Sequence, residues 1–311
     1  MAEEIRYQLD DLPAFRQHLR SLNLHRHAEN EEQSYVFTGA GDSFAAAKAA
    51  EHLSGFRAKA LDPYDICLRP NLLKGKHLFV ISVSGRTKTN IEAARAVRGI
   101  AEKVTAITAD DQSLLAHNCG DCIRLRFRRT GELTPGTGSF TATLLACYSK
   151  IRALPKITNL DRMFDECVRW SDALELSSGG TTFMVGTGLN YSMAMYGAAK
   201  MYEVLGWRSQ YQATEQFSHM ELFSLCERDV VLLLPDSSKD SKAGRLENLL
   251  RGNGWKVARI DPGYDDAILG SIATAMCLQI LTWRVALKAE LKECSFKAKG
   301  RHLHLSDEMI Y

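Results

Sequence analysis

Hydroxyl side chains cluster at one point of the stretch LFVISVSGRTKTN, residues 78–90. Ser82, Ser84 and Thr87 follow an apolar run and stand directly before a helical pattern of apolar residues. Serine and threonine favour turns and helix N-caps, so a capped turn is one explanation. The other is a phosphate pocket, in which hydroxyls and the N–H groups of a helix amino end bind the anion and Gly85 leaves its approach free.

A second set of reactive side chains lies in the C-terminal half. Lys200 and Glu203 are three residues apart, so they share one face of a helix. Alone, such a pair would be a surface ion pair, but its neighbours are small and apolar. Partial desolvation there would raise the pKa of the Glu203 carboxyl toward that of a general base. His219 follows in a loop-like stretch and can transfer protons near neutral pH, with Glu215 and Glu221 as alternative bases.

The elements that must position these residues follow one plan twice. Residues 35–50 and 182–198 each read as a short apolar strand, a Gly-x-Gly turn and a helix of small residues. Further strands are expected at 78–84 and 104–109 in the first half and at 230–235 and 256–261 in the second. Strands that alternate with helices and form continuous apolar runs indicate parallel sheets buried on both faces.

We therefore predict an α/β protein of two duplicated three-layer α/β/α subdomains with flavodoxin-like parallel sheets. The expected divisions are a helical segment at 1–32, a first subdomain at 33–155, a linker helix at 156–178, a second subdomain at 179–300 and a tail at 301–311. Ligands of such sheets bind beyond the carboxyl ends of the strands, which is where the Gly-x-Gly turns and the serine-rich loop fall.

The composition excludes several other classes of protein. The chain has 311 residues, 45% of them hydrophobic and 24% charged, as in a globular protein. Lys and Arg number 39 against 37 Asp and Glu, so no basic field favours a nucleic-acid partner. No apolar run of transmembrane length and no signal peptide are evident, which predicts a cytoplasmic protein without a membrane partner. The eight cysteines are predicted to be reduced thiols that fill the core.

Cofactor motifs are weak or incomplete. The turn at Gly39 and Gly41 has Phe44 at the third glycine position of a dinucleotide fingerprint, and no Walker A motif occurs. The pair Cys119 and Cys122 has no second pair to complete a zinc site. His302 and His304 alternate as on a strand but have no carboxylate between them. We expect neither a cofactor nor a metal.

Four stretches carry a resemblance to a known family. They are FTGAGDS (37–43), VISVSGRT (80–87), TPGTGSFTATLLA (134–146) and GAAKMYEVLGWRSQYQATEQFSHMELFSL (197–225). With them the sequence resembles the SIS family of sugar-phosphate isomerases and binding modules. It is most similar to the double-SIS proteins, which include the isomerase domain of glucosamine-6-phosphate synthase and its stand-alone relatives.

The resemblance implies roles for the residues of these stretches. Those expected at the sugar phosphate are Ser82, Ser84, Thr87, Ser43 and Val83, the last through its backbone N–H. Those expected elsewhere on the substrate are Gly41, Asp42 and Thr134. Arg86 stands where the family often has glutamate or asparagine, so its role is open between the phosphate and solvent.

The resemblance also assigns the catalytic residues. Glu203 matches the glutamate that moves the proton, His219 the histidine that opens the sugar ring, and Lys200 a lysine one turn before the glutamate. A lysine of the C-terminal segment enters the site in relatives, and both Lys297 and Lys299 are candidates.

The function implied is aldose–ketose isomerisation of a hexose 6-phosphate or its 2-amino analogue through an enediol-type intermediate. A glucosamine-6-phosphate deaminase is the close alternative, because the same intermediates can lead to loss of ammonia. A sugar-phosphate sensor without catalysis is the third possibility. The sequence contains no amidotransferase domain, and relatives that build their sites from two subunits lead us to expect a homodimer.

Overall fold

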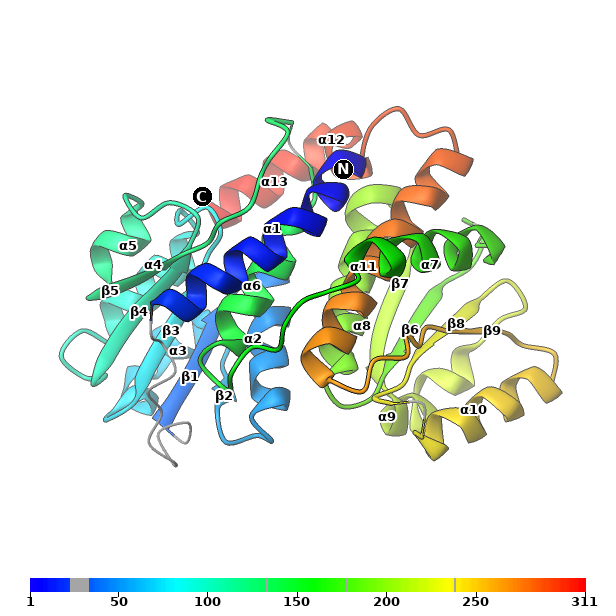
Figure 1. Ribbon diagram of the computed structural model, residues 1–311, viewed down its shortest axis with the longest axis horizontal. Coiled ribbons are helices and arrows are strands. Elements are labelled where there is room, and N and C mark those ends of the chain that lie inside the picture. Colours follow the sequence, from blue (N-terminus) through cyan, green and yellow to red (C-terminus); the bar gives the residue numbers. More distant parts are fainter. Residues whose placement is uncertain (23–33, 133, 177, 238) are drawn as a thin grey trace. The chain divides into compact units, whose positions relative to one another are not determined.

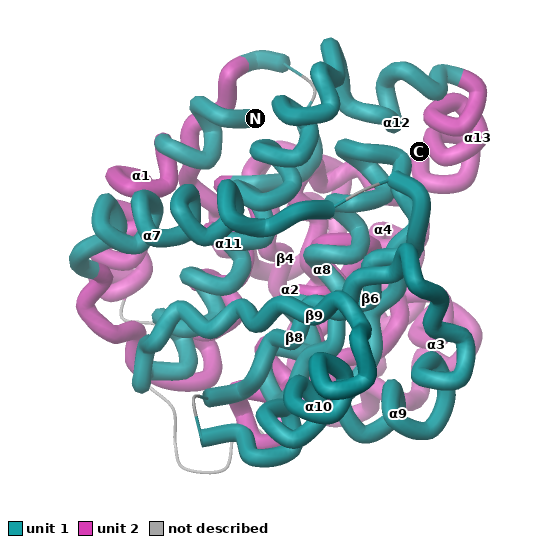
Figure 2. The backbone as a smooth tube through the Cα atoms, turned by 90° about the vertical axis from the view of Figure 1, so that its right-hand side faces the viewer, with its two compact units in different colours: residues 1–6, 131–137, 158–300 teal, residues 7–130, 138–157, 301–311 magenta. Residues whose placement is uncertain are grey.

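The computed structural model describes residues 1–22, 34–132, 134–176, 178–237 and 239–311. The chain divides into two compact units (Figure 2). Unit 1 comprises Met1–Arg6, Gly131–Thr137 and Thr158–Gly300, and unit 2 comprises Tyr7–Thr130, Gly138–Ile157 and Arg301–Tyr311. Helix α1 (Ala2–Ser21) confirms the helix expected at the N-terminus; the rest of the segment 1–32 lies largely outside the described residues.

Unit 2 is built on a parallel sheet whose five strands have the order β2-β1-β3-β4-β5 (Figure 1). The strands are β1 (Tyr35–Gly39), β2 (Lys59–Ala60), β3 (His77–Ile81), β4 (Lys103–Thr108) and β5 (Asp121–Arg124). The helices are α2 (Asp42–Leu53), α3 (Pro63–Leu68), η2 (Pro70–Leu73), α4 (Lys88–Ala96), α5 (Leu114–Asn118) and α6 (Gly138–Tyr148). One core cluster joins the sheet to α3, α4 and α5, while α2 packs with α6 and against β1.

Unit 1 repeats this plan with a four-stranded parallel sheet of order β7-β6-β8-β9. The strands are β6 (Thr182–Gly186), β7 (Ser209–Ala213), β8 (Val230–Leu234) and β9 (Lys256–Arg259). The helical elements are α7 (Leu160–Ala173), α8 (Asn190–Lys200), η3 (Met201–Leu205), α9 (Thr214–His219), η4 (Glu221–Ser224), α10 (Ser241–Gly252), α11 (Ala267–Lys288) and α12 (Ser295–Ala298). A core cluster joins β6 and β8 to α9 and α10, and α8 packs with α11.

The predicted duplication is confirmed by the strand registers. Gly39 of β1 pairs with Ile81 of β3, and Gly186 of β6 pairs with Leu234 of β8, so the two Gly-x-Gly turns hold the same place in their sheets. Strands β2, β5 and β7 were not expected from the sequence. All three lie at a sheet edge, where a strand has one neighbour and needs no continuous apolar run.

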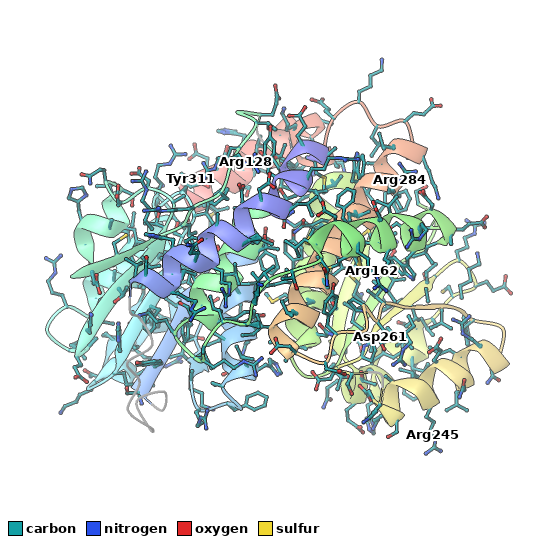
Figure 3. The ribbon with its side chains drawn as sticks, in the orientation of Figure 1. Arg128, Arg162, Arg245, Asp261, Arg284 and Tyr311 are labelled. Atoms are coloured by element: carbon teal, nitrogen blue, oxygen red, sulfur yellow. A yellow bond between two sulfur atoms is a disulfide. The ribbon has the colours of Figure 1, made fainter. Side chains whose placement is uncertain are left out.

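Helices α7 and α11 of unit 1 are linked by an ion pair and a disulfide. Arg284 of α11 (labelled in Figure 3) makes a bidentate ion pair with Asp172 of α7, with N···O distances of 2.7 and 2.9 Å. Cys167 of α7 and Cys277 of α11 form a disulfide. The prediction that all cysteines are reduced is therefore wrong for this pair, because the α7–α11 packing brings together two residues that are 110 positions apart.

Helix α11 is long and apolar enough to cross a membrane by length and composition alone, although polar residues interrupt it; 78% of its most apolar window is buried in the molecule.

The strand expected around the C-terminal histidines is wrong. His302 and His304 lie on helix α13 (Gly300–Ile310) and not on a strand, since the C-terminal segment has a helical pattern of apolar residues. Both histidines are exposed.

Candidate functional site

The serine-rich loop of unit 2 joins the carboxyl end of β3 to α4. Ser82 is buried, with 3% of its surface exposed, and its Oγ lies 3.1 Å from Oγ1 of Thr87. The loop is closed by a hydrogen bond from Gly85 N to Ser82 O of 3.0 Å, and Arg86 N donates to Ser84 Oγ over 3.3 Å. The loop therefore holds its three hydroxyl groups at one end of the sheet.

Helix capping does not account for these hydroxyls. Thr87 is the N-cap residue of α4, but its side chain makes no capping hydrogen bond. By contrast, Ser113, Asp240 and Asp266 cap α5, α10 and α11 with their side chains. The first N–H groups of a helix have no partners within it, so α4 presents uncapped donors beside the hydroxyls. This arrangement suits an anion better than it suits a capped turn.

Gly85 is required for the packing of the loop and not for access of an anion. Its φ is +64°, and a side chain there would lie 2.1 Å from Oγ of Ser113. Glycine is therefore required for the packing of the loop against the start of α5, which corrects the idea that Gly85 clears the approach of an anion.

The first Gly-x-Gly turn lies beside this loop, because β1 and β3 are neighbours in the sheet. Gly41 precedes α2 as its N-cap residue and makes no side-chain cap, Asp42 begins the helix, and Ser43 is buried. The structure thus brings the start of α2 and the loop of Ser82 to the same edge of unit 2, with Val83 partly exposed between the serines.

The corresponding edge of unit 1 carries an acid instead. Counting from the paired residues Ile81 and Leu234, Asp236 takes the place of Val83. Its Oδ1 accepts a hydrogen bond of 3.3 Å from Leu189 N, at the second Gly-x-Gly turn. A carboxylate in this position repels a phosphate, so the loop of Ser82, Ser84 and Thr87 in unit 2 suits an anion better than its counterpart in unit 1 does.

Lys200 and Glu203 lie together in unit 1, as their spacing predicts. The Lys200 side chain is completely buried and its Nζ bonds to Oε2 of Glu203, whose side chain is 39% exposed. The Nζ also lies 5.0 Å from the centroid of the Tyr196 ring. The pair is thus no surface ion pair, although the carboxylate is less desolvated than the sequence suggested.

The turn that carries Glu203 is a π-helix, η3, which the sequence analysis did not foresee. Turns of this type are rare and occur often at functional sites. Helix α12 packs on η3. A side chain at residue 206, directly after η3, would lie 2.9 Å from Nζ of Lys299. Lys297 instead points to Glu132, with an N···O distance of 3.6 Å, so Lys299 is the C-terminal lysine beside the Glu203 turn.

Thr134 contacts protein rather than open space. Its hydroxyl donates a hydrogen bond of 2.7 Å to Oε2 of Glu4, a buried carboxylate that also accepts from Thr137. The hydroxyl of Thr134 therefore has a structural partner within unit 1.

His219 ends helix α9, where the sequence suggested a loop, and its side chain is 69% exposed. Its Nε2 lies 3.0 Å from Oε1 of Glu215, which also pairs with Lys242. Glu221 accepts a hydrogen bond of 2.9 Å from the Gln212 side chain through its Oε1. The imidazole is thus oriented by one carboxylate and otherwise open to solvent.

Glu203 and His219 lie at opposite ends of strand β7. The turn η3 precedes the amino end of β7, and α9 follows its carboxyl end (Figure 1). A strand of five residues spans about 16 Å, at about 3.3 Å per residue. Their elements are thus separated along the chain by the length of this strand.

The fold is that of the double-SIS proteins, as the resemblance implied. Glucosamine-6-phosphate deaminase from Thermotoga maritima matches with a TM-score of 0.78 and 19% identity, over 93% of this chain and 94% of that one. Tagatose-6-phosphate ketose/aldose isomerase from Escherichia coli matches with a TM-score of 0.74 and 16% identity, over 92% of each chain.

A third similar structure is the C-terminal domain of glucosamine-fructose-6-phosphate aminotransferase from Francisella tularensis. Its TM-score is 0.71 with 16% identity, over 92% of this chain and 95% of that domain. No family model matches the sequence, and no curated protein matches it significantly. At these identities the likeness establishes the fold.

Proposed function

We propose that the protein is a sugar-phosphate isomerase that acts on a hexose 6-phosphate or an amino-hexose 6-phosphate in the cytoplasm. The observation that carries the proposal is the Glu203 carboxylate, partly exposed and held by a fully buried ammonium group. A positioned carboxylate is the base that moves a proton between C1 and C2, and proton transfer alone interconverts the aldose and the ketose. Three solved proteins of this fold are named for reactions of sugar phosphates.

Each group of residues has a separate task in this proposal. The loop of Ser82, Ser84 and Thr87, with the Val83 N–H and Ser43, binds the phosphate and so places the sugar. Glu203 transfers the proton, Lys200 and Lys299 stabilise negative charge, and His219 opens the ring.

In this proposal a second copy of the chain supplies the histidine. Opening the ring moves a proton at the ring oxygen, which is bonded to C1, so the histidine and the base act on neighbouring atoms. The turn of Glu203 precedes β7 and the helix of His219 follows it, which favours their acting from two copies. We therefore propose a homodimer in which Glu203 of one copy and His219 of the other serve the same substrate.

A glucosamine-6-phosphate deaminase is the alternative, and it is favoured by the similarity to the Thermotoga maritima deaminase. Incubation with a panel of hexose and hexosamine 6-phosphates, with both the isomer and free ammonia measured, separates the two. Isomer without ammonia supports the proposal, and ammonia supports the deaminase. Binding without either product would identify a sensor and contradict both.

A further inference from the structure

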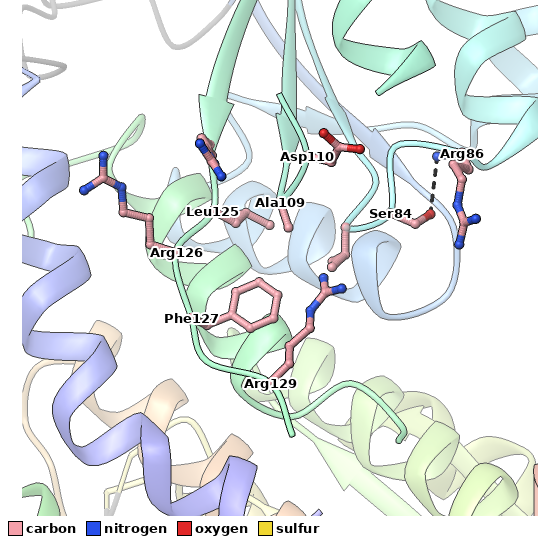
Figure 4. A pocket seen from close by; sticks show the side chains of 10 residues that line it. Ser84, Arg86, Ala109, Asp110, Leu125, Arg126, Phe127 and Arg129 are labelled. Carbon is pink, nitrogen blue, oxygen red and sulfur yellow. Dashed lines mark hydrogen bonds between the residues drawn. The ribbon is translucent and has the colours of Figure 1, made fainter. Parts of the chain in front are cut away.

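A separate cavity opens in unit 2 over the carboxyl ends of β3, β4 and β5 (Figure 4). Its volume is about 720 Å³, within the range of pockets that take whole small molecules. One wall is the far side of the serine-rich loop, with Val83 and Ser84; the opposite wall is the segment after β5, with Leu125, Phe127 and Arg129. The proposed function gives this space no role.

The segment after β5 is extended, and its alternation decides which side chains enter the cavity. Leu125 N donates to Thr108 O over 2.8 Å, which continues the pairing with β4. Arg128 (Figure 3) turns to α1, where it bonds to Asp10 and Asp11 over 2.8 and 2.7 Å. In an extended chain the neighbouring side chains point the other way. Accordingly, Arg129 extends toward the loop of Ser84, beside Phe127 (Figure 4).

The charges around the cavity are unbalanced. Its lining residues include four arginines and one carboxylate, Asp110. Arg124 is neutralised by Asp111 at 3.2 Å. Over the described ranges neither Arg86 nor Arg129 forms an ion pair. The Arg129 guanidinium lies 4.8 Å from the centroid of the Phe127 ring. The Arg86 guanidinium lies 5.6 Å from the centroid of the Tyr311 ring. Two uncompensated positive charges therefore lie on two sides of the cavity. One is Arg129, and the other is Arg86, on the rim beyond Ser84.

We propose that this cavity binds a small molecule with at least two anionic groups, phosphate or carboxylate, and that Arg129 and Arg86 are the residues that recognise them. Guanidinium groups bind such anions through paired N–H donors. The Ser84 hydroxyl can donate to the same ligand, and Leu125 and Phe127 provide an apolar surface for its carbon skeleton. Because Ser84 belongs to both sites, the ligand would lie beside the bound sugar phosphate, as a separate effector or as a second acidic group of the substrate itself.

Inorganic pyrophosphate is a suitable probe, titrated calorimetrically into the full chain at low ionic strength. Arg129→Gln and Arg86→Gln should each weaken its binding by about tenfold or more, the usual effect of a lost hydrogen bond to a charged group. Arg126→Gln is the matched control, because it removes the same charge from the same segment of the lining, while its side chain extends in the opposite direction from those of Phe127 and Arg129 (Figure 4).

An equal loss in Arg126→Gln and Arg129→Gln would overturn the proposal, since it would mean general attraction by net charge. Unchanged binding in both cavity variants would do the same. Repeating the titration with saturating glucose 6-phosphate identifies the source: simultaneous binding indicates an effector, and competition indicates a two-headed substrate. The titration needs no turnover, so failure of the isomerase proposal leaves its result readable.

Discussion

At the scale of single residues, the burial of Lys200 explains the position of Glu203. A buried ammonium group is costly unless a negative charge or hydrogen bonds compensate for it, and Glu203 supplies such a charge from the next turn. The carboxylate is thereby held in place while part of it faces solvent. A residue with both a structural partner and an exposed oxygen is suited to act as a positioned base.

Replacement of Glu203 by Gln should keep the shape of the site and remove the base. We expect turnover to fall by about a hundredfold or more, the usual effect of a lost general base, while sugar-phosphate binding is nearly kept. In deuterated water the wild type should exchange label into C1 or C2 and Glu203→Gln should not. Undiminished exchange in the variant would move the role of base to Glu215 or Glu221. The control, His219→Ala, should be far less harmful to the open-chain fraction of the substrate.

Replacement of Thr87 by Ala tests the phosphate loop directly. A hydrogen bond to a charged group contributes about 1.5–3 kcal/mol, so affinity for the sugar phosphate should fall by about tenfold or more. Thr89→Ala, which changes the same residue type two positions further along α4, should have little effect. Equal affinities of the two variants in calorimetry would mean that the loop hydroxyls do not bind the phosphate.

At the scale of elements, the beginning of β3 contains a histidine that resists protonation. Burial, and then the positive charges of Lys103 and Lys150, lower the pKa of His77 from 6.5 to about 4. The ring is stacked on Phe79 and its Nε2 lies 2.8 Å from Oγ1 of Thr105. The neutral imidazole is therefore part of the packing of the first sheet.

This histidine should make the protein sensitive to acid. Between pH 6.5 and about 4 the unfolded chain binds a proton at His77 that the folded chain does not, so the free energy of unfolding should decrease as the pH falls through this window. His77→Gln keeps a polar partner for Thr105 without the titration, so it should lose this part of the decrease. Denaturant titrations across the window measure the difference; parallel curves for both proteins would rule out His77 as the source.

At the scale of the whole molecule, the shared site predicts rescue between two inactive variants. If each site takes Glu203 from one copy and His219 from the other, a mixed dimer of Glu203→Gln and His219→Ala contains one intact site. Random mixing should then restore about a quarter of the wild-type activity on the closed-ring substrate, because half of the dimers are mixed and each has one good site. No recovery after mixing and refolding would show that one chain supplies both groups. Sedimentation should find the dimer.

The disulfide predicts a response to reductant. A bond that closes a long loop stabilises a protein by about 2–4 kcal/mol, so reduction of Cys167–Cys277 should lower the melting temperature of the wild type. A Cys167→Ala, Cys277→Ala double variant should show no such change. Alkylation of the denatured protein should label six cysteines before reduction and all eight after it. Eight labelled thiols at the outset would mean that the bond does not form.

The sequence by itself determined the duplicated parallel architecture and the place of the phosphate loop. Apolar runs, Gly-x-Gly turns and the hydroxyl cluster after β3 are local patterns, and parallel strands necessarily bring their carboxyl ends to one edge. The pairing of Lys200 with Glu203 was equally readable, since helical spacing fixes it.

Only the tertiary structure decided how these parts are used. The polar strand β7 gives no apolar signal at its sheet edge, so the separation of Glu203 from His219 was invisible in the sequence. The Cys167–Cys277 bond depends on the packing of α7 against α11, and the placement of Asp236 at the second Gly-x-Gly turn depends on the register of β6 with β8. The last two are contacts between residues far apart in the chain, which no local pattern of residue types specifies.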